Sequence, residues 1–291
     1  MNRRRIAIFV LICLMAVTAT VSSFVGFLSI SHSEFYQSIT PRREIVQYQA
    51  GGVYAHNPRY LATEAVGSDL ATAVLAVPLL LVAGVMFLRG SNRGSVLLIG
   101  SLAYFLYKYL QQALRLAFND LFLVYTLLIA LSLVTLVLVL SLLSSKGLLR
   151  PFRDEAPRVA PAIFLMAYGV AVLIQWLPAI LSPQIAGETP EILQGQFTLV
   201  LQAMDLGLLV PVAILAGVLL TKRSPYSRIL ASALLVKIGL MGLVLLFMAI
   251  MRSSAAGDID LFELLLSSAM ALGGIGFTIR FLANTREPSP Y

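Results

Sequence analysis

The residues of this chain that could do chemistry are polar side chains embedded in long apolar segments. Tyr104, Lys108, Gln111 and Arg115 follow one another at spacings of 4, 3 and 4, which places them on one face of a helix. A charge near the centre of a bilayer costs at least about 2.5–3.5 kcal/mol, so such groups face a partner or a cavity. This face therefore predicts an ion pair or a ligand site.

Further polar residues lie in other apolar segments. Gln202 and Asp205 are three apart and share a helical face, while Gln175 and Asp69 each stand in a segment of their own. We expect these groups to meet in one externally open pocket that binds a small polar or amphipathic ligand. The candidate substrate-binding residues are Tyr104, Lys108, Gln111, Arg115, Gln175, Gln202, Asp205 and Asp69.

The sharpest expectation concerns a buried pair between Lys108 and Asp205. The lysine side chain leans toward the start of its outward-running helix and so away from external water, which makes a partner necessary. Asp69 is the competing partner, but it lies only three residues inside its predicted segment, where water can reach it. Lys237 is expected to extend toward the cytoplasmic interface instead.

Motifs for other chemistry are not found. The sequence has no His-Glu-x-x-His, Gly-x-Ser-x-Gly, phosphate-binding loop or Cys-x-x-Cys pattern, and Cys13 is its single cysteine. His32 and His56 are the two histidines and lie far apart without further soft ligands. We therefore predict no catalytic residue, no metal and no cofactor.

The elements that must position the polar residues are membrane-spanning helices. Apolar residues make up 59% of the 291 residues and charged residues 12%, whereas soluble domains have about 45–50% and about 25%. The mean hydropathy of +0.89 agrees with this. Spanning a bilayer takes about 20 apolar residues. An all-α integral membrane protein with eight transmembrane helices is predicted, spanning residues 6–30, 66–88, 95–114, 121–143, 160–181, 197–220, 229–251 and 261–282.

The first of these segments follows a basic stretch, as a signal peptide would. Its apolar run continues through Phe27 and Leu28, past the length of a signal sequence, so we expect a retained anchor.

Basic residues set the orientation, because cytoplasmic loops are enriched in lysine and arginine. Fourteen of the 21 basic residues fall on the side of the termini, and five fall on the other side. Both termini are thus expected in the cytoplasm. The same distribution accounts for the net charge of +7 without nucleic acid as a partner. The external loop 31–65 is long for a helical protein and is predicted to contact a protein partner.

An internal duplication is suggested by two similar stretches, one in each half of the chain. When Pro78 is aligned with Pro211, Gly84 falls on Gly217, and a basic residue follows each proline after eleven positions. If the similarity reflects duplication, residues 1–150 and 151–291 are parallel four-helix halves, as in some transporters.

The stretches Leu88-Arg89-Gly90-Ser91, residues 104–109 and residues 119–125 resemble a family of bacterial multi-pass inner-membrane proteins without an assigned activity. The resemblance covers mainly the second to fourth predicted helices, with a weaker similarity in the sixth and seventh. It implies a location in the bacterial inner membrane and assigns no functional residues.

Three functions fit these features. The first is a transporter or permease for a small polar or amphipathic solute, favoured by duplicated halves, kinked helices and charges inside the membrane. The second is a noncatalytic sensor or assembly factor that acts through the external loop. The third is an enzyme for a lipid-linked substrate, with Asp69 or Asp205 as base and Tyr104 or Lys108 steadying an anion. No spacing of nucleophile and base supports the enzyme.

Overall fold

A computed structural model describes residues 3–29, 34–145, 152, 158–224, 227–256 and 261–287. The chain is about 79% helical. Within the described ranges, seven helical segments are long and apolar enough to cross a membrane. The predicted all-α fold with several helices able to cross a membrane is therefore confirmed.

The elements run in chain order as follows: α1 (Arg3–Leu28), β1 (Phe35–Ile39), β2 (Ile45–Gln49), α2 (Arg59–Ala71), the π-helix η1 (Thr72–Ala76), α3 (Val77–Leu88), α4 (Asn92–Arg115), α5 (Phe122–Ser145), α6 (Val159–Ala186), the short 3₁₀ helix η2 (Glu191–Leu193), α7 (Val200–Met204), the π-helix η3 (Asp205–Leu209), α8 (Val210–Thr221), α9 (Ser227–Ala256) and α10 (Leu261–Ala283).

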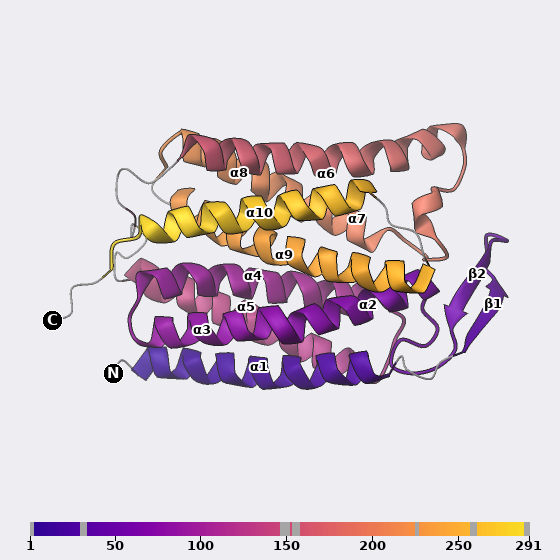
Figure 1. Ribbon diagram of the computed structural model, residues 1–291, viewed down its shortest axis with the longest axis horizontal. Helices are drawn as coiled ribbons and strands as arrows, with labels where there is room; N and C mark the ends of the chain where they lie inside the picture. Colours follow the sequence, from indigo (N-terminus) through magenta and orange to yellow (C-terminus); the bar gives the residue numbers. More distant parts are fainter. Residues whose placement is uncertain are drawn as a thin grey trace.

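The helices form two groups that lie side by side, α1 to α5 and α6 to α10 (Figure 1). The groups meet where α9 packs on α4 and α2. Small residues permit this approach, since a β-carbon at Gly100 would lie 2.7 Å from the Ala233 carbonyl oxygen. One at Gly67 would lie 2.9 Å from the Cα atom of Met248. Such close backbone contact is how helices associate in membranes, where burial of apolar surface adds little.

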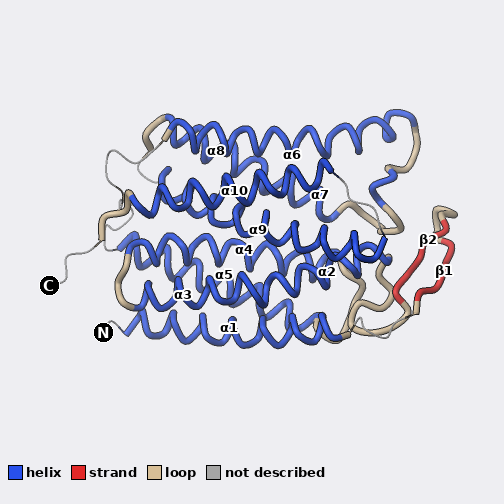
Figure 2. The backbone as a smooth tube through the Cα atoms, viewed as in Figure 1, coloured by secondary structure: helices blue, strands red, loops and turns tan. Residues whose placement is uncertain are grey.

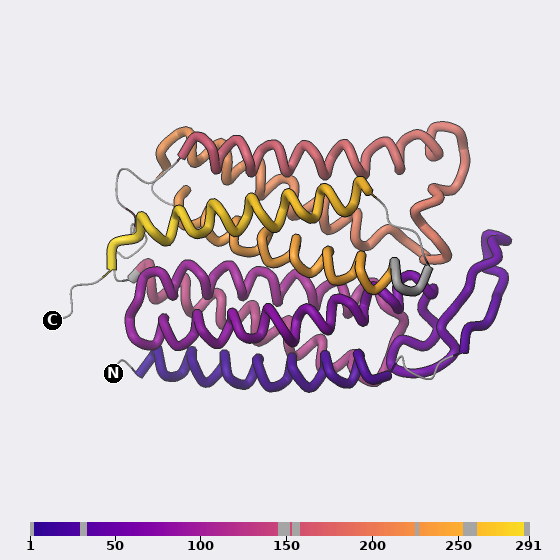
Figure 3. The backbone as a smooth tube through the Cα atoms, in the orientation of Figure 1, coloured from indigo at the N-terminus to yellow at the C-terminus, as the bar shows by residue number. Residues whose placement is uncertain are grey.

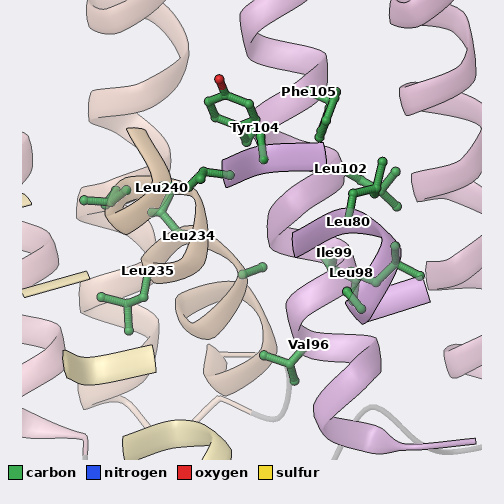
Figure 4. Packing of buried hydrophobic residues seen from close by; sticks show 14 of the residues in the cluster. Leu80, Val96, Leu98, Ile99, Leu102, Tyr104, Phe105, Leu234, Leu235 and Leu240 are labelled. Carbon is green, nitrogen blue, oxygen red and sulfur yellow. The ribbon is translucent and has the colours of Figure 1, made fainter. Parts of the chain in front are cut away.

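Helix α4 is the one predicted span that is not among the seven apolar segments. It extends over 24 residues and carries tyrosine, lysine and glutamine side chains. It lies between α3, α5 and α9, so most of its surface faces protein (Figure 4). Leu80 of α3 packs on one side of it and Leu234, Leu235 and Leu240 of α9 on the other. A helix surrounded by other helices does not need a uniformly apolar surface.

The two segments with matching prolines contain the same irregularity. Each continues from an α-helix through a five-residue π-helix into a second α-helix, and the alignment of Pro78 with Pro211 also brings the first residues of η1 and η3 into register. The two prolines are the second residues of α3 and α8. Proline has no N–H and its ring clashes with the carbonyl four residues earlier. The wider π turn ahead of each proline accommodates that clash.

Glycines at matching positions also make matching contacts. A β-carbon at Gly84 of α3 would lie 3.0 Å from Cγ2 of Ile12 in α1. One at Gly217 of α8 would lie 2.6 Å from Cγ of Met166 in α6. Helix α3 therefore packs on α1, and α8 on α6, through an equivalent glycine.

The segment between the first two predicted spans differs from expectation. Residues 35–49 form a β-hairpin that extends beyond the bundle (Figure 2). Helix α2 then begins at Arg59 and not at 66, so the predicted loop 31–65 ends earlier. The additional stretch 59–65 contains the polar residues Arg59, Thr63 and Glu64, which lower its hydropathy below that of a membrane span. Glu64 pairs with Arg115 of α4 and Arg252 of α9, so its charge is accommodated against other helices.

The starts and ends of the helices otherwise follow the prediction within a few residues. Helix α6 continues to Ala186 through Pro178 and Pro183, and Gly187 ends it with a φ of 73°. The predicted end of the first span at Ile30 lies outside the described residues, as do His32, Lys146, Arg150 and Arg153.

Both chain ends lie at the same end of the bundle, opposite the hairpin (Figure 3). The N–H of Asn92 donates to Glu287 at 2.9 Å, which joins the start of α4 to the segment after α10. Arg5 donates to the carbonyl of Phe87 at 3.0 Å and joins α1 to the end of α3. Many basic residues are located at this end: Arg3, Arg4, Arg5, Arg89, Arg93, Arg158, Lys222, Arg223, Arg228, Arg280 and Arg286.

Candidate functional site

The predicted site residues fall into two polar clusters, one in each group of helices. Asp69, Tyr104 and Lys108 belong to the first cluster. Asp205 and its neighbours Gln175 and Gln202 belong to the second. Gln111 and Arg115 of α4 line the cavities beside both clusters.

The first cluster is a complete buried ion pair. Nζ of Lys108 lies 3.0 Å from Oδ1 of Asp69 and donates to Oγ of Ser68 at 2.9 Å. The Asp69 carboxylate also accepts from Nε2 of Gln112 at 3.1 Å and from the Tyr54 hydroxyl. The side chains of Lys108 and Asp69 are 4% and 1% exposed, so this pair is shielded from solvent.

The predicted pair between Lys108 and Asp205 is therefore wrong. Asp69 is the partner because α2 begins at Arg59, which places Asp69 ten residues into the helix, about 15 Å from its start. With a helix that begins at residue 66, Asp69 would lie only about 5 Å from the helix start, within reach of water. Asp69 and Lys108 consequently lie at the same depth.

Tyr54, in the segment between β2 and α2, covers the pair from the end of the bundle that carries the hairpin, called the outer end below. Burial, followed by the nearby Asp69 carboxylate, raises the pKa of the Tyr54 hydroxyl well above its usual range. The hydroxyl thus remains protonated and donates to Asp69. Gly26 of α1 leaves room for both groups, since a β-carbon there would collide with them.

Tyr104 lies one turn inward of this pair. Its hydroxyl is 2.9 Å from Oγ1 of Thr72, the first residue of η1. The cavity beside Lys108 and Tyr104 measures about 40 Å³. The ammonium of Lys108 and the carboxylate of Asp69 thus both have hydrogen-bond partners within the first cluster.

Asp205 is the centre of the second cluster and begins η3. Its Oδ1 accepts from the Tyr107 hydroxyl of α4, and its Oδ2 accepts from Nε1 of Trp176 at 2.9 Å. These donors come from α4 and α6, so the carboxylate connects both groups of helices. The side chain is 9% exposed.

Lys237 of α9 completes the second cluster and was missed as a candidate. It is 3% exposed, and its Nζ lies 3.9 Å from the centre of the Tyr107 ring. The Asp205 carboxylate attracts it electrostatically. Among the described residues, no hydrogen-bond acceptor is within reach of Nζ.

The expectation that Lys237 extends to the cytoplasmic interface is therefore wrong. The nearest helix end, Ser227, is ten residues away, about 15 Å. Residues of α4 and α10 pack on this part of α9 and close that path. The same distance could have marked Lys237 as a candidate in the sequence.

A cavity of about 300 Å³ lies beside Asp205 and Lys237. Along α9 it is lined by one helical face with spacings of 4, 4, 3 and 4: Lys237, Met241, Leu245, Met248 and Arg252. At the rise of an α-helix this face corresponds to a depth of about 22 Å. Its other walls come from α2, α4, α6, η2, α7, η3 and α10. Those walls include Gln175, Gln202, Tyr168, Trp176, Leu266 and Met270.

Four charged residues form a chain of ion pairs at the outer end of this cavity. Glu64 of α2 lies 3.1 Å from Arg115 of α4 and 3.3 Å from Arg252 of α9. Arg252 also pairs with Glu263 of α10. Partly exposed pairs of this kind stabilise a fold only modestly. Their position, however, sets the electrostatic potential at the cavity entrance.

The β-hairpin lies over the loop that precedes α7. The Tyr48 hydroxyl donates to the carbonyl of Gly195 at 3.4 Å, and Arg42 donates to the carbonyl of Gln196 at 3.4 Å. Gln196 also bonds to Tyr60, a residue of the cavity wall. Segments of both groups thus contact each other at the hairpin end of the bundle, next to the cavity entrance.

The residues that the structure describes contain no group of three or more histidine, cysteine, aspartate and glutamate side chains able to hold a metal ion. No family model, curated protein or solved structure matches this chain. Functional interpretation therefore rests on the two clusters and the cavity.

Proposed function

We propose that this protein is a membrane transporter that binds a small polar or amphipathic solute in the cavity beside Asp205 and Lys237. One observation carries the proposal. The cavity extends from the ion pairs at the outer end to the buried Asp205 carboxylate, five residues inside the helical segment that begins at Val200, and to the buried Lys237 ammonium, ten residues from the inner end of α9. Polar groups at this depth are costly in a membrane, and transporters place their substrate sites there.

The proposal includes eight spans, with α4 as the eighth. Its 24 residues cover about 36 Å, enough for the hydrocarbon core of a bilayer. An even number of spans agrees with chain ends at one end of the bundle (Figure 3). The basic residues near that end favour a cytoplasmic location for both termini. With the family resemblance, this favours the inner membrane of a bacterium.

The proposal also includes duplication of a four-helix unit, with α1 to α5 and α6 to α10 as its copies. The matching π-helices support it, as do the equivalent contacts of Gly84 and Gly217. In the same alignment Gly100 contacts Ala233, which is its own counterpart in the second copy. A residue that touches its counterpart lies next to the axis relating two copies, so α4 and α9 are the central helices.

The same contact suggests how access alternates. Ala233 lies one turn inward of Lys237, so the close approach of α4 and α9 closes the cavity toward the cytoplasm. Transporters with repeated halves move one half against the other around a fixed site. In this protein the halves would rock where α4 and α9 meet and open the inner side of the cavity.

Uptake into proteoliposomes tests the function. Four solutes with a phenyl group serve as probes: phenylpropanesulfonate, phenylalanine, phenylpropyltrimethylammonium and phenyl glucoside. We expect protein-dependent uptake of at least one. Leu245→Trp fills the cavity and should abolish that uptake, whereas Ile250→Trp, at a position that is 62% exposed, should preserve it.

Two results would contradict the proposal. Binding of a probe without uptake would identify the protein as a receptor rather than a transporter. Uptake that is unchanged in Leu245→Trp would place the pathway outside the cavity.

A further inference from the structure

We propose that the solute of this cavity is an amphipathic organic anion whose acidic headgroup binds Lys237 and whose apolar body lies along α9. This inference rests on the proposed function and specifies its substrate class. The acidic headgroup is a carboxylate, sulfonate or phosphonate carried by a small apolar body.

The ammonium of Lys237 is the first reason. A lysine side chain offers three N–H donors and no acceptor. Nζ of Lys237 has none of its donors satisfied by the described residues, although the residue is only 3% exposed. Leaving a buried charge without hydrogen bonds is costly. A ligand that supplies a negatively charged acceptor removes this cost.

The surroundings of Lys237 point its ammonium at the cavity. The Tyr107 ring lies 3.9 Å from Nζ, a distance that suits a cation over an aromatic face. Lys237 itself is part of the cavity lining. The ring covers one side of the ammonium, so donors remain for the cavity side.

Asp205 does not take the place of the missing acceptor. Its two oxygens already accept from Tyr107 and Trp176, which hold the carboxylate next to α4 and α6. Among the described residues, Lys237 and Asp205 form no ion pair: no oxygen of Asp205 lies within 4.0 Å of Nζ of Lys237. Asp205 thus attracts the lysine without binding it.

The first cluster provides an internal comparison. Lys108 is similarly buried, but it donates to Asp69 and Ser68 and its neighbouring cavity measures only about 40 Å³. The counterparts of Asp205 and Lys237 in the first half are Thr72 and Tyr104, which form a neutral hydrogen bond. In the first half, therefore, the Lys108 ammonium has an acceptor, and the positions equivalent to Asp205 and Lys237 are hydrogen-bonded to each other. The unsatisfied ammonium is specific to the half that contains the large cavity.

The wall above Lys237 fits the apolar part of such a ligand. Met241, Leu245 and Met248 follow it along α9, and Leu266 and Met270 face them from α10. Methionine side chains adapt to apolar groups of different shape. A ligand with its acidic headgroup at Lys237 would place its body against this wall and below the ion pairs of the entrance.

Trp176 provides a direct test, because it is the single tryptophan of the chain and donates to Asp205 inside the cavity. Its fluorescence is recorded with the protein in phosphatidylcholine nanodiscs. Phenylpropanesulfonate, phenylpropanol and phenylpropyltrimethylammonium share one body and differ in charge. We expect the sulfonate to change the emission saturably and to bind at least about tenfold more tightly than the other two, a difference of about 1.4 kcal/mol. Equal or tighter binding of the cation would overturn the inference.

Variants of Lys237 locate the charge. Lys237→Met retains the length of the side chain and should weaken sulfonate binding at least about tenfold, since a buried charge partner is lost. Lys237→Arg should retain most of the affinity. The control is Lys222→Met, the same change at an exposed position at the end of α8, which should bind as the original protein does. Unchanged affinity in Lys237→Met contradicts the inference.

A cavity-filling variant separates this inference from the proposed function. Leu245→Phe should weaken binding of every probe that binds. If Leu245→Phe weakens binding while Lys237→Met does not, the cavity is the binding site and its ligand is not selected as an anion. If neither variant changes binding, both proposals fail. Should Lys237→Met not fold, the charge series on the original protein and Lys237→Arg still decide the question.

Discussion

Nζ of Lys237 lies 3.9 Å from the centre of the Tyr107 ring, although the two residues belong to different halves of the molecule. The hydroxyl of the same tyrosine donates to Asp205. Tyr107 of α4 thus holds a cation of α9 with its ring and an anion of η3 with its hydroxyl. One side chain from the first half therefore organises the candidate site of the second half.

This dual contact predicts graded effects of substitution. Tyr107→Phe keeps the ring and removes the hydrogen bond to Asp205, which is worth about 1.5–3 kcal/mol for a charged acceptor. Tyr107→Leu removes the cation–π contact as well, a further loss of about 0.5–2 kcal/mol. Both variants should lower the midpoint of thermal unfolding, and Tyr107→Leu should lower it more. Equal midpoints for the two variants would exclude a role of the ring.

The buried pair of Asp69 and Lys108 predicts strong coupling. Removing one member of a buried pair leaves the other charge unpaired and typically costs about 3–5 kcal/mol. Asp69→Asn and Lys108→Met should each lower the free energy of unfolding by an amount of this order. The double variant should recover part of the loss. Additive losses in this double-mutant cycle would show that the two side chains do not interact in the membrane-embedded protein.

The sequence predicted a buried ion pair at Lys108 but assigned it the wrong partner. Lys108 was correctly expected to need an acidic partner inside the bundle, because its side chain leans away from external water. The choice between Asp69 and Asp205 depended on where α2 begins, and hydropathy alone could not place that start. Because α2 begins at Arg59 and not at residue 66, Asp69 lies deeper in the bundle than predicted and reaches Lys108.

Lys237 was misjudged for a related reason. The position of Lys237 along its own helix suggests an interfacial lysine, but α4 and α10 pack against α9 and separate it from the interface. The contacts of α4 and α10 with α9 are formed by residues distant in sequence, so periodicity cannot reveal them. The apolar spans themselves were predictable, since the bilayer sets their length and composition.

The matching glycines predict unequal sensitivity to alanine. At Gly217 a β-carbon would meet the Ala162 carbonyl oxygen at 2.9 Å, and backbone atoms cannot move without shifting α6. At Gly84 the nearest atoms are side-chain carbons, Cγ2 of Ile12 at 3.0 Å and Cδ1 of Ile12 at 3.3 Å, so a shift of a few tenths of an ångström relieves the contact. Gly217→Ala should therefore cost about 1–3 kcal/mol of stability and Gly84→Ala less. Thermal unfolding of both variants in one detergent measures this difference, and a larger loss in Gly84→Ala would contradict it.

The proposed orientation predicts which positions react with an impermeant thiol reagent in intact cells. In a Cys13→Ala background, Ser38→Cys of the hairpin and Ala186→Cys at the end of α6 should be labelled from outside. Lys222→Cys and Ser224→Cys lie at the other end of the bundle and should be labelled only after the membrane is opened. If Lys222→Cys and Ser224→Cys are labelled from outside and the other two variants are not, the orientation is the reverse of the proposed one. If one variant of each pair is labelled from outside, the eight-span topology is contradicted.

Glu64 predicts how the entrance handles anions. Its carboxylate accepts from both Arg115 and Arg252, so Glu64→Gln leaves two arginines facing each other with half of their counter-charge removed. Because Arg252 is 29% exposed but Glu64 and Arg115 only 14% and 10%, the loss of stability should lie between that of a surface pair, about 1 kcal/mol, and that of a buried pair, about 3–5 kcal/mol. The more positive entrance should at the same time speed the association of phenylpropanesulfonate, followed by stopped-flow fluorescence of Trp176. High salt should remove the acceleration, because ions screen the field at a partly exposed site. Glu64→Asp retains the charge and serves as the control, and an acceleration of the same size in that variant would rule out an electrostatic cause.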